Sequence, residues 1–212
     1  MIILALDTCL GACSVALDSD DRLLAHASET MARGHQERLA PMVERVLAEA
    51  GLSPGVVTRV AVTVGPGSFT GLRVGIAFAK GFAQALGAGT VGVGVLEALA
   101  AEADGLVCAA IDARRDQVYL QVFEEGVPLM APDVLPIGTA AARLAEITRG
   151  RTLALVGSGA ALLADAAPGA RIIPAEGCNA RRVARIAAAR DTGPLIPLYL
   201  RPPDAKLPAA RA

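Results

Sequence analysis

Ile2-Ile3-Leu4-Ala5-Leu6-Asp7, near the start of the chain, is an apolar run that ends in a carboxylate. A similar run, Leu106-Val107-Cys108-Ala109-Ala110-Ile111-Asp112, comes about halfway along the chain. Short uninterrupted apolar runs bounded by turn residues predict buried β-strands. Two further extended segments follow each run, at residues 13–17 and 23–27 in the first case and at residues 117–123 and 127–135 in the second. The chain therefore starts the same three-strand pattern twice.

The elements after these strands also repeat in order. In the first half we expect helix, strand, helix, strand and short helix at residues 36–50, 60–64, 70–86, 90–95 and up to 103. In the second half we expect helix, strand, helix, strand and helix at residues 138–148, 152–156, 160–166, 172–173 and 179–190. Alternating strands and helices are typical of α/β packing. We predict two similar α/β halves, residues 1–104 and 105–201, that share an interface, and a flexible tail at residues 202–212.

Composition limits the classes of function. The chain has 20 basic and 21 acidic residues, a net charge of -1, whereas proteins that bind nucleic acid on their own usually carry a basic excess. Contact with RNA would need a local patch or a partner. Met1 leads straight into the first strand without a basic leader, and no apolar stretch reaches the roughly 18 residues of a membrane span. We expect a cytoplasmic protein with no membrane contact.

Two strand-end carboxylates and two glycine turns suggest a ligand site. Ligands of α/β proteins bind beyond the carboxyl ends of the strands, and glycine turns let backbone N–H groups approach a phosphate. Both sets could face one cleft and hold a nucleotide, although an ordinary turn or cap residue is the alternative for each. The candidate nucleotide-binding residues are Asp7, Thr8, Gly65, Asp112, Gly157 and Gly159.

Other chemistry lacks the residues it needs. The two histidines, His26 and His35, do not have the spacing of converging metal ligands. No G-x-S-x-G pattern surrounds Ser68. The four cysteines form no C-x-x-C pair, so we expect buried reduced thiols. We predict no catalytic residue and no metal site.

The segment Gly65-Pro66-Gly67-Ser68-Phe69-Thr70-Gly71-Leu72-Arg73-Val74-Gly75 closely resembles the signature of the TsaB (YeaZ) family. Members of that family are the dimerisation subunit of the bacterial system that makes threonylcarbamoyladenosine in tRNA. Further segments resemble the family in the same order along the chain, at residues 4–8, 12–17, 35–42, 112–114, 118–119 and 197–201. The resemblance thus extends over nearly the whole chain.

The resemblance implies a duplicated actin-like fold of the ribonuclease-H type. It implies a non-catalytic subunit that works beside the catalytic relative TsaD and the ATPase TsaE, which together transfer threonylcarbamoyl to tRNA adenosine, with tRNA contacted through the complex. The chain departs from the family at Cys9, where Ser is usual, and at Leu10-Gly11, where a more polar pair is usual. These changes weigh against nucleotide binding, so we expect no cofactor, with weak binding of ATP or ADP left open.

Two other functions remain as alternatives. One is an autonomous ATP-dependent phosphotransferase of the actin-like group, with Asp7 and Asp112 around a nucleotide and a metal. The other is a metallopeptidase, suggested only by an old label of the wider family, and it lacks the ligand histidines.

The helix expected at residues 70–86 is apolar over most of its circumference, so it should be buried on more than one side. Glycine inside a helix costs roughly 0.5–1 kcal/mol relative to alanine, so Gly71 and Gly75 need a reason. Close packing inside the monomer is one reason, and a partner surface is the other. Because family members pair through the first two helices, the resemblance favours an interface with TsaD, or with a second copy of the chain. We expect Gly75→Leu to abolish pairing without unfolding. The predicted interface residues are Leu39, Val43, Gly71, Arg73, Gly75, Phe78, Ala79 and Phe82.

Overall fold

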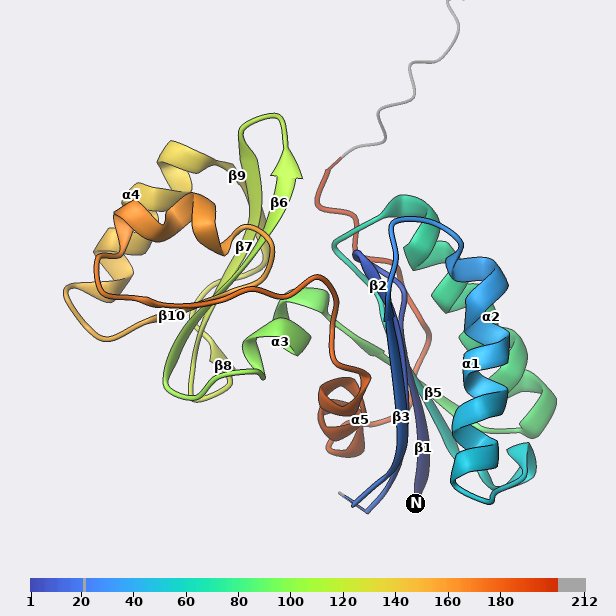
Figure 1. Cartoon of the computed structure of the whole chain (residues 1–212). Helices are drawn as coiled ribbons and strands as arrows, with labels where there is room; N and C mark the ends of the chain where they lie inside the picture. The colour runs from blue at the N-terminus through green and yellow to red at the C-terminus, as the bar shows by residue number, and fades with distance from the viewer. Residues whose placement is uncertain (21, 202–212) are drawn as a thin grey trace, which may run out of the picture.

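The computed structural model describes residues 1–20 and 22–201, arranged as two sheets with their helices (Figure 1). The predicted tail at residues 202–212 lies outside this range. The first sheet has the order β3-β2-β1-β4-β5. Its strands are β1 (Ile2–Asp7), β2 (Ala12–Ser19), β3 (Arg22–Thr30), β4 (Arg59–Thr63) and β5 (Gly89–Val93). The second sheet has the order β11-β10-β6-β7-β8, and β9 also pairs with β7. Its strands are β6 (Leu106–Arg114), β7 (Gln117–Glu124), β8 (Val127–Pro128), β9 (Asp133–Pro136), β10 (Ala154–Val156) and β11 (Arg171–Ile173).

The two sheets repeat one topology. In each, the first three strands pair antiparallel, and the later strands add in parallel on the other side of the opening strand. The turn after the first parallel strand added to the opening strand, β4 or β10, repeats as well, because Gly65 has φ +106° and Gly157 has φ +108°. Side chains rarely adopt that backbone conformation, which explains glycine at both positions. The predicted duplicated α/β fold of the ribonuclease-H type is confirmed.

Helices cover both sheets. On the first sheet, α1 (His35–Glu49) and α2 (Phe69–Leu86) lie on one face and α5 (Ala180–Ala188) lies on the other (Figure 1). On the second sheet, α4 (Ile137–Thr148) and η2 (Ala160–Ala166) pack together, and α3 (Val95–Ala100) contacts β6 and β7. A short 3₁₀ turn, η1 (Pro54–Val56), precedes β4. The segment at 160–166, predicted as a helix, is 3₁₀ rather than α.

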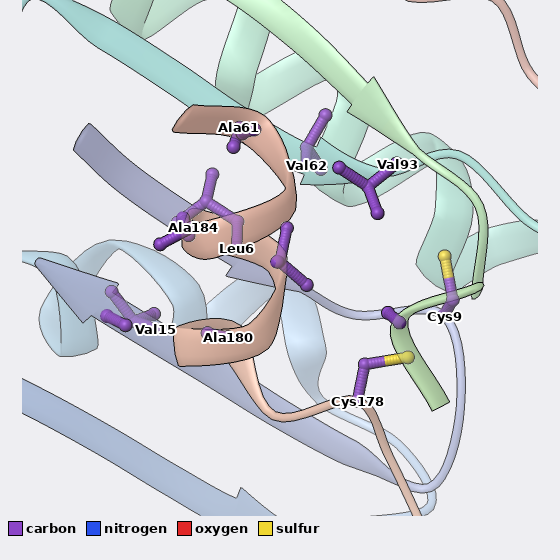
Figure 2. Packing of buried hydrophobic residues seen from close by; sticks show 14 of the residues in the cluster. Leu6, Cys9, Val15, Ala61, Val62, Val93, Cys178, Ala180 and Ala184 are labelled. Carbon is purple, nitrogen blue, oxygen red and sulfur yellow. The ribbon is translucent and has the colours of Figure 1, made fainter. Parts of the chain in front are cut away.

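The last helix packs on the opposite half from the one in which its sequence lies. α5 contacts β1 and β2 of the first sheet, and Figure 2 shows Ala180 and Ala184 against Leu6 and Val15. In return α3, from the first half of the sequence, packs on the second sheet. Our prediction that residues 105–201 form the second half is therefore wrong for α5. The physical reason is that α1 and α2 cover only one face of the first sheet, and the small apolar side of α5 closes the other.

A closing segment, residues 189–201, follows α5 and connects the two halves. The N–H of Gly193 donates to the carbonyl of Thr90 (2.8 Å), and the N–H of Leu198 donates to the carbonyl of Val64 (2.7 Å). At its end, Nη1 of Arg201 donates to the carbonyl of Ala113 in β6 (3.0 Å). Across the described part of the chain, no helix is long and apolar enough to cross a membrane.

Candidate functional site

Asp7, the last residue of β1, is completely buried. Its Oδ1 accepts hydrogen bonds from Thr63 Oγ1 (2.6 Å) and from the N–H of Cys9 (3.1 Å). Its Oδ2 accepts from the N–H of Cys178 (2.8 Å), in the loop between β11 and α5. The loop that leads into α5 therefore closes over the carboxylate, and both of its oxygens are used within the chain.

Burial controls the electrostatics of this carboxyl. Removal from water raises the pKa of Asp7 above its ordinary value of 3.8, and this outweighs the three hydrogen bonds, which lower it. Around it lie Cys9 and Cys178, two thiols whose pKa values are also raised, chiefly by burial. Asp7 therefore holds the end of β1 to the loop before α5, next to two buried thiols and out of contact with solvent.

The equivalent residue of the second half, Asp112, has a different environment. Its Oδ1 accepts from the N–H of Arg114 (2.8 Å), and Oδ2 pairs with Nη1 of Arg114 (3.0 Å). The N–H of Asp112 donates to Ser158 Oγ (3.2 Å). Asp112 thus fixes the start of the turn between β6 and β7 and is occupied within its own half.

The glycine turns approach backbone of this chain. A side chain at Gly157 would meet the carbonyl of Ala110, and one at Gly159 would meet the backbone of Ile111. The N–H of Gly159 donates to the carbonyl of Ala110 (3.0 Å). At Gly65 a side chain would lie 2.6 Å from the carbonyl of Leu198, in the closing segment. These turns are shaped to pass close to neighbouring strands and loops.

The six predicted nucleotide-binding residues do lie at or next to the carboxyl ends of β1, β4, β6 and β10, as expected. The expectation that they face one open cleft is wrong. Asp7 and Thr8 are completely buried, and Thr8 Oγ1 donates to the carbonyl of Gly71 (2.7 Å). Nucleotide binding itself stays a prediction. Among the described residues, no group of three or more His, Cys, Asp or Glu side chains is placed to hold a metal ion.

Gly71 and Gly75 of α2 face inward. A side chain at Gly71 would meet the carbonyl of Thr8, and one at Gly75 would lie 2.5 Å from Thr8 Oγ1 and 3.2 Å from Val62. Both glycines are buried, and they let α2 lie directly on the loop after β1. Close packing within the monomer therefore accounts for both glycines, and a leucine at Gly75 would clash with Thr8, so Gly75→Leu should destabilise the monomer.

The other predicted interface residues divide into two groups. Leu39, Val43 and Ala79 are buried in the core, so their placement on a partner surface is also wrong. Their regular spacing marks the inner face of each helix, which a sequence pattern alone does not distinguish from an outer apolar face. Phe78 and Phe82 are half-buried and stack with ring centroids 5.6 Å apart, and Arg73 is exposed.

One strip of the outward side of α2, next to the exposed polar residues Arg73, Lys80 and Gln84, is apolar or small. We call it the outer face of α2, and it consists of Val74, Ala77, Phe78, Gly81, Phe82 and Ala85. Gly81 is exposed, and a Cβ there would have no other atom of residues 1–20 and 22–201 within 4 Å. Beside this face, a hollow of about 360 Å³ opens between the first turns of α1 and α2, with Gly34, Ser68 and Val74 in its lining.

The sequence pattern did not identify Phe69 and Tyr199 as functional candidates. They are 48% and 46% exposed, and their ring centroids are 5.7 Å apart at the first turn of α2. Both residues lie within segments that resemble the TsaB signature and closing motif. Only the structure shows that these two segments meet.

The fold is that of a duplicated actin-like protein of the ribonuclease-H type. Its two sheets have the same strand order, each sheet is covered by a helix from the other half of the sequence, and the aspartate at the end of β1 is buried. Residues 25–161 match the family described as TsaD: tRNA N6-adenosine threonylcarbamoyltransferase. The structure is similar to that of YeaZ from Pseudomonas aeruginosa, with a TM-score of 0.81 at 33% identity, over 94% of this chain and 99% of that one. The chain belongs to the TsaB (YeaZ) family, which shares the TsaD-type domain.

Sequence relatives agree with this assignment. The tRNA threonylcarbamoyladenosine biosynthesis protein TsaB of Escherichia coli is 44% identical over 129 residues, which are 58% of this chain and 55% of that protein. The alignment thus spans about half of that relative. An uncharacterised protein of Mycobacterium tuberculosis is 36% identical over 206 residues, 96% of this chain and 93% of that protein.

Proposed function

We propose that the chain is a non-catalytic partner subunit in the biosynthesis of threonylcarbamoyladenosine in tRNA. In this role it supports a TsaD-type protein, which transfers the threonylcarbamoyl group to a tRNA adenosine. The family supplies the pathway, since the Escherichia coli relative is named for it. The partner would bind by packing on the outer face of α2.

Gly81 is the observation that carries the interface. Glycine within a helix costs roughly 0.5–1 kcal/mol relative to alanine. Gly71 and Gly75 offset that cost by close contact with Thr8, but among the described residues no other atom lies within 4 Å of a Cβ placed at Gly81. A helix backbone from outside, packed against α2, would explain a missing side chain at this position. The half-buried Phe78 and Phe82 and the exposed Ala77 and Ala85 around it also suit a protein contact.

The proposal of a non-catalytic role rests on how the strand-end carboxylates are used. A general base must be able to reach a substrate proton. Both oxygens of Asp7 are bonded within a buried site, and Asp112 is paired with Arg114. Asp7 thus suits a structural role where β1 meets the loop before α5, and Asp112 suits one at the turn between β6 and β7.

Further components follow from the same assignment. We expect a TsaE-type ATPase in the assembly, contact with tRNA through the complex, and a cytoplasmic location, where tRNA is modified. In the absence of the TsaD-type partner, the outer face of α2 would take a second copy of the chain. The charges of the two helices differ in a way that suits such pairing, because α1 carries three exposed glutamates, Glu37, Glu44 and Glu49, against two exposed arginines, while the only charges of α2 are Arg73 and Lys80.

Depletion of the chain in the bacterium that encodes it tests the proposed function. Mass spectrometry of digested tRNA should show less threonylcarbamoyladenosine after depletion, and the wild-type gene should restore it. The Gly81→Arg variant should fold and yet fail to restore it, because a long cation would hold the partner off α2. Unchanged modification after complete depletion would contradict the proposal.

A matched control is available on another helix. Gly138 is also exposed, near the start of α4, and a side chain there would meet nothing within 4 Å. Gly138→Arg should restore the modification as well as the wild type does. Equal failure of both variants would show that arginine at any exposed helix glycine is harmful, and the interface on α2 would lose its support.

A further inference from the structure

Arg73 is an exposed cation at the border of the outer face of α2, held in place by aromatic rings. Its guanidinium carbon lies 3.5 Å from the ring centroid of Phe69. Its Nε donates to the hydroxyl of Tyr199 (3.3 Å), 126 positions away in the closing segment. Phe69 of α2 and Tyr199 of the closing segment, far apart in sequence, thus hold one guanidinium.

The guanidinium keeps most of its binding capacity. Arginine carries five N–H donors, and only Nε is bonded to Tyr199. Within the described residues, no carboxylate oxygen lies within ion-pairing distance of Arg73. Several other arginines of the chain do form ion pairs with a carboxylate. The side chain is therefore both ordered and without an anionic partner.

Such an arrangement is pre-organised for a carboxylate. Guanidinium groups bind carboxylates through two parallel hydrogen bonds, and stacking on an aromatic ring leaves the in-plane donors free. Because Phe69 and Tyr199 already restrict the side chain, binding costs less ordering entropy than it would for a free arginine. Arginine, tyrosine and other aromatic residues are also enriched at positions that dominate protein interfaces.

We infer that Arg73, held by Phe69 and Tyr199, is the anchor for an acidic side chain of the protein that packs on the outer face of α2. This inference rests on the proposed function, because it takes that partner to be the TsaD-type protein. The anchor is continuous with the outer face, since Val74 and Ala77 lie within about one turn of Arg73 on the same helix. A protein fits better than a nucleic acid, because α2 offers small and apolar residues beside the anchor and the chain has a net charge of -1.

The partner's affinity for a set of single variants tests the inference. With the purified TsaD-type protein of the same organism, isothermal titration should show Arg73→Ala weakening binding by about tenfold or more. Arg73→Lys should lose most of the same affinity, because lysine keeps the charge but neither stacks nor binds in two-pronged fashion. Tyr199→Phe should cause a smaller loss, because it removes only the hydroxyl that holds Nε.

The control is an exposed arginine away from α2. Arg185 lies on α5, which covers the opposite face of the first sheet, and Arg185→Ala should bind like the wild type. Double-mutant cycles between Arg73→Ala and Glu→Gln or Asp→Asn changes in the partner should then find one strongly coupled carboxylate.

Three results would overturn the inference. One is wild-type affinity of Arg73→Ala or of Arg73→Lys, and another is an equal loss in Arg185→Ala. The third is a loss confined to binding of tRNA, which would point to a phosphate contact. If the wild type itself fails to bind the TsaD-type protein, the proposed function fails with it, whereas normal wild-type binding with an indifferent Arg73 removes only the anchor.

Discussion

The carboxylate of Asp7 and the backbone N–H of Cys178 form a 2.8 Å hydrogen bond across 171 positions of sequence. This bond joins the end of the first strand to the loop before the last helix. The neighbouring Gly177 is tightly placed, since a side chain there would lie 2.6 Å from the Cβ of Ala12. The carboxyl end of β1 is thus covered by the backbone of the loop before α5.

Replacement of Asp7 by asparagine should destabilise the protein by about 1–3 kcal/mol, because the NH₂ group of asparagine would face the N–H of Cys178, which would then have no acceptor.

The loss of stability in Asp7→Asn should depend on pH. Burial raises the folded pKa of Asp7 above its unfolded value of 3.8. The stability from proton uptake is then fully present below the unfolded pKa and is lost as pH rises through the folded pKa. Urea denaturation between pH 4 and 8 should therefore show the advantage of the wild type over Asp7→Asn shrinking as pH rises. An advantage that grows with pH would contradict a raised pKa.

Alanine at the glycines of α2 should separate inward from outward positions. Gly71→Ala places a methyl group against the carbonyl of Thr8, and strain of this kind typically costs about 1–3 kcal/mol. Gly81→Ala meets no atom and should stabilise the free monomer by roughly 0.5–1 kcal/mol through helix propensity. Thermal unfolding should show a lower melting temperature for Gly71→Ala and a higher one for Gly81→Ala than for the wild type. Destabilisation by Gly81→Ala would indicate a contact within the monomer and remove the main support for the interface.

Arg59 in β4 should be needed to hold α5 on the first sheet. Its Nη1 donates to the carbonyls of Ala187 (2.6 Å) and Arg190 (2.8 Å), at the C-terminal end of that helix. Cations stabilise helix C-termini, so Arg59→Ala should cost about 1–2 kcal/mol. Hydrogen exchange should then speed up in α5 and not in α4. Arg143→Ala, which breaks an exposed ion pair with Asp133, is the matched control and should change stability by less than about 1 kcal/mol. Equal effects of the two variants would contradict the role of Arg59.

The thiols should be inert in the folded protein. Cys9, Cys13, Cys108 and Cys178 are all buried and unpaired. Burial raises the pKa of Cys13 and of Cys108 to about 12, so neither forms the reactive thiolate near neutral pH. A thiol-disulfide reagent at pH 8 should detect no fast-reacting cysteine in the native protein and all four after unfolding in guanidinium chloride. Rapid modification of even one thiol in the native state would show that the region around it opens.

Local elements of the fold could be predicted closely from sequence. β1 was predicted with its observed bounds, and α2 was predicted to within one residue at its start, because apolar periodicity and the stop at Gly87 are local signals. The duplication was also visible, since strand ends and glycine turns recur in order. Periodicity identifies an element and its apolar face, but it does not identify the sheet on which that face packs. The exchange of α3 and α5 therefore had to come from the structure.

The candidate site was predictable in composition but not in orientation. Asp7, Gly65 and Gly157 were placed at strand ends by sequence, yet their burial depends on the loop before α5 and on the closing segment, which are distant in sequence. In α2, spacing alone did not separate Gly71 and Gly75, which contact Thr8, from Gly81, where an added Cβ would meet no other described residue within 4 Å. The cluster of Phe69, Arg73 and Tyr199 was missed because it joins two segments 126 positions apart at its hydrogen bond.

The affinity of the chain for the TsaD-type protein of the same organism, with and without Gly81→Arg, tests the central claim most directly. We predict stable binding by the wild type and by Gly138→Arg, and loss of binding by Gly81→Arg with an unchanged melting temperature. Binding of Gly81→Arg with wild-type affinity would contradict a partner surface on the outer face of α2.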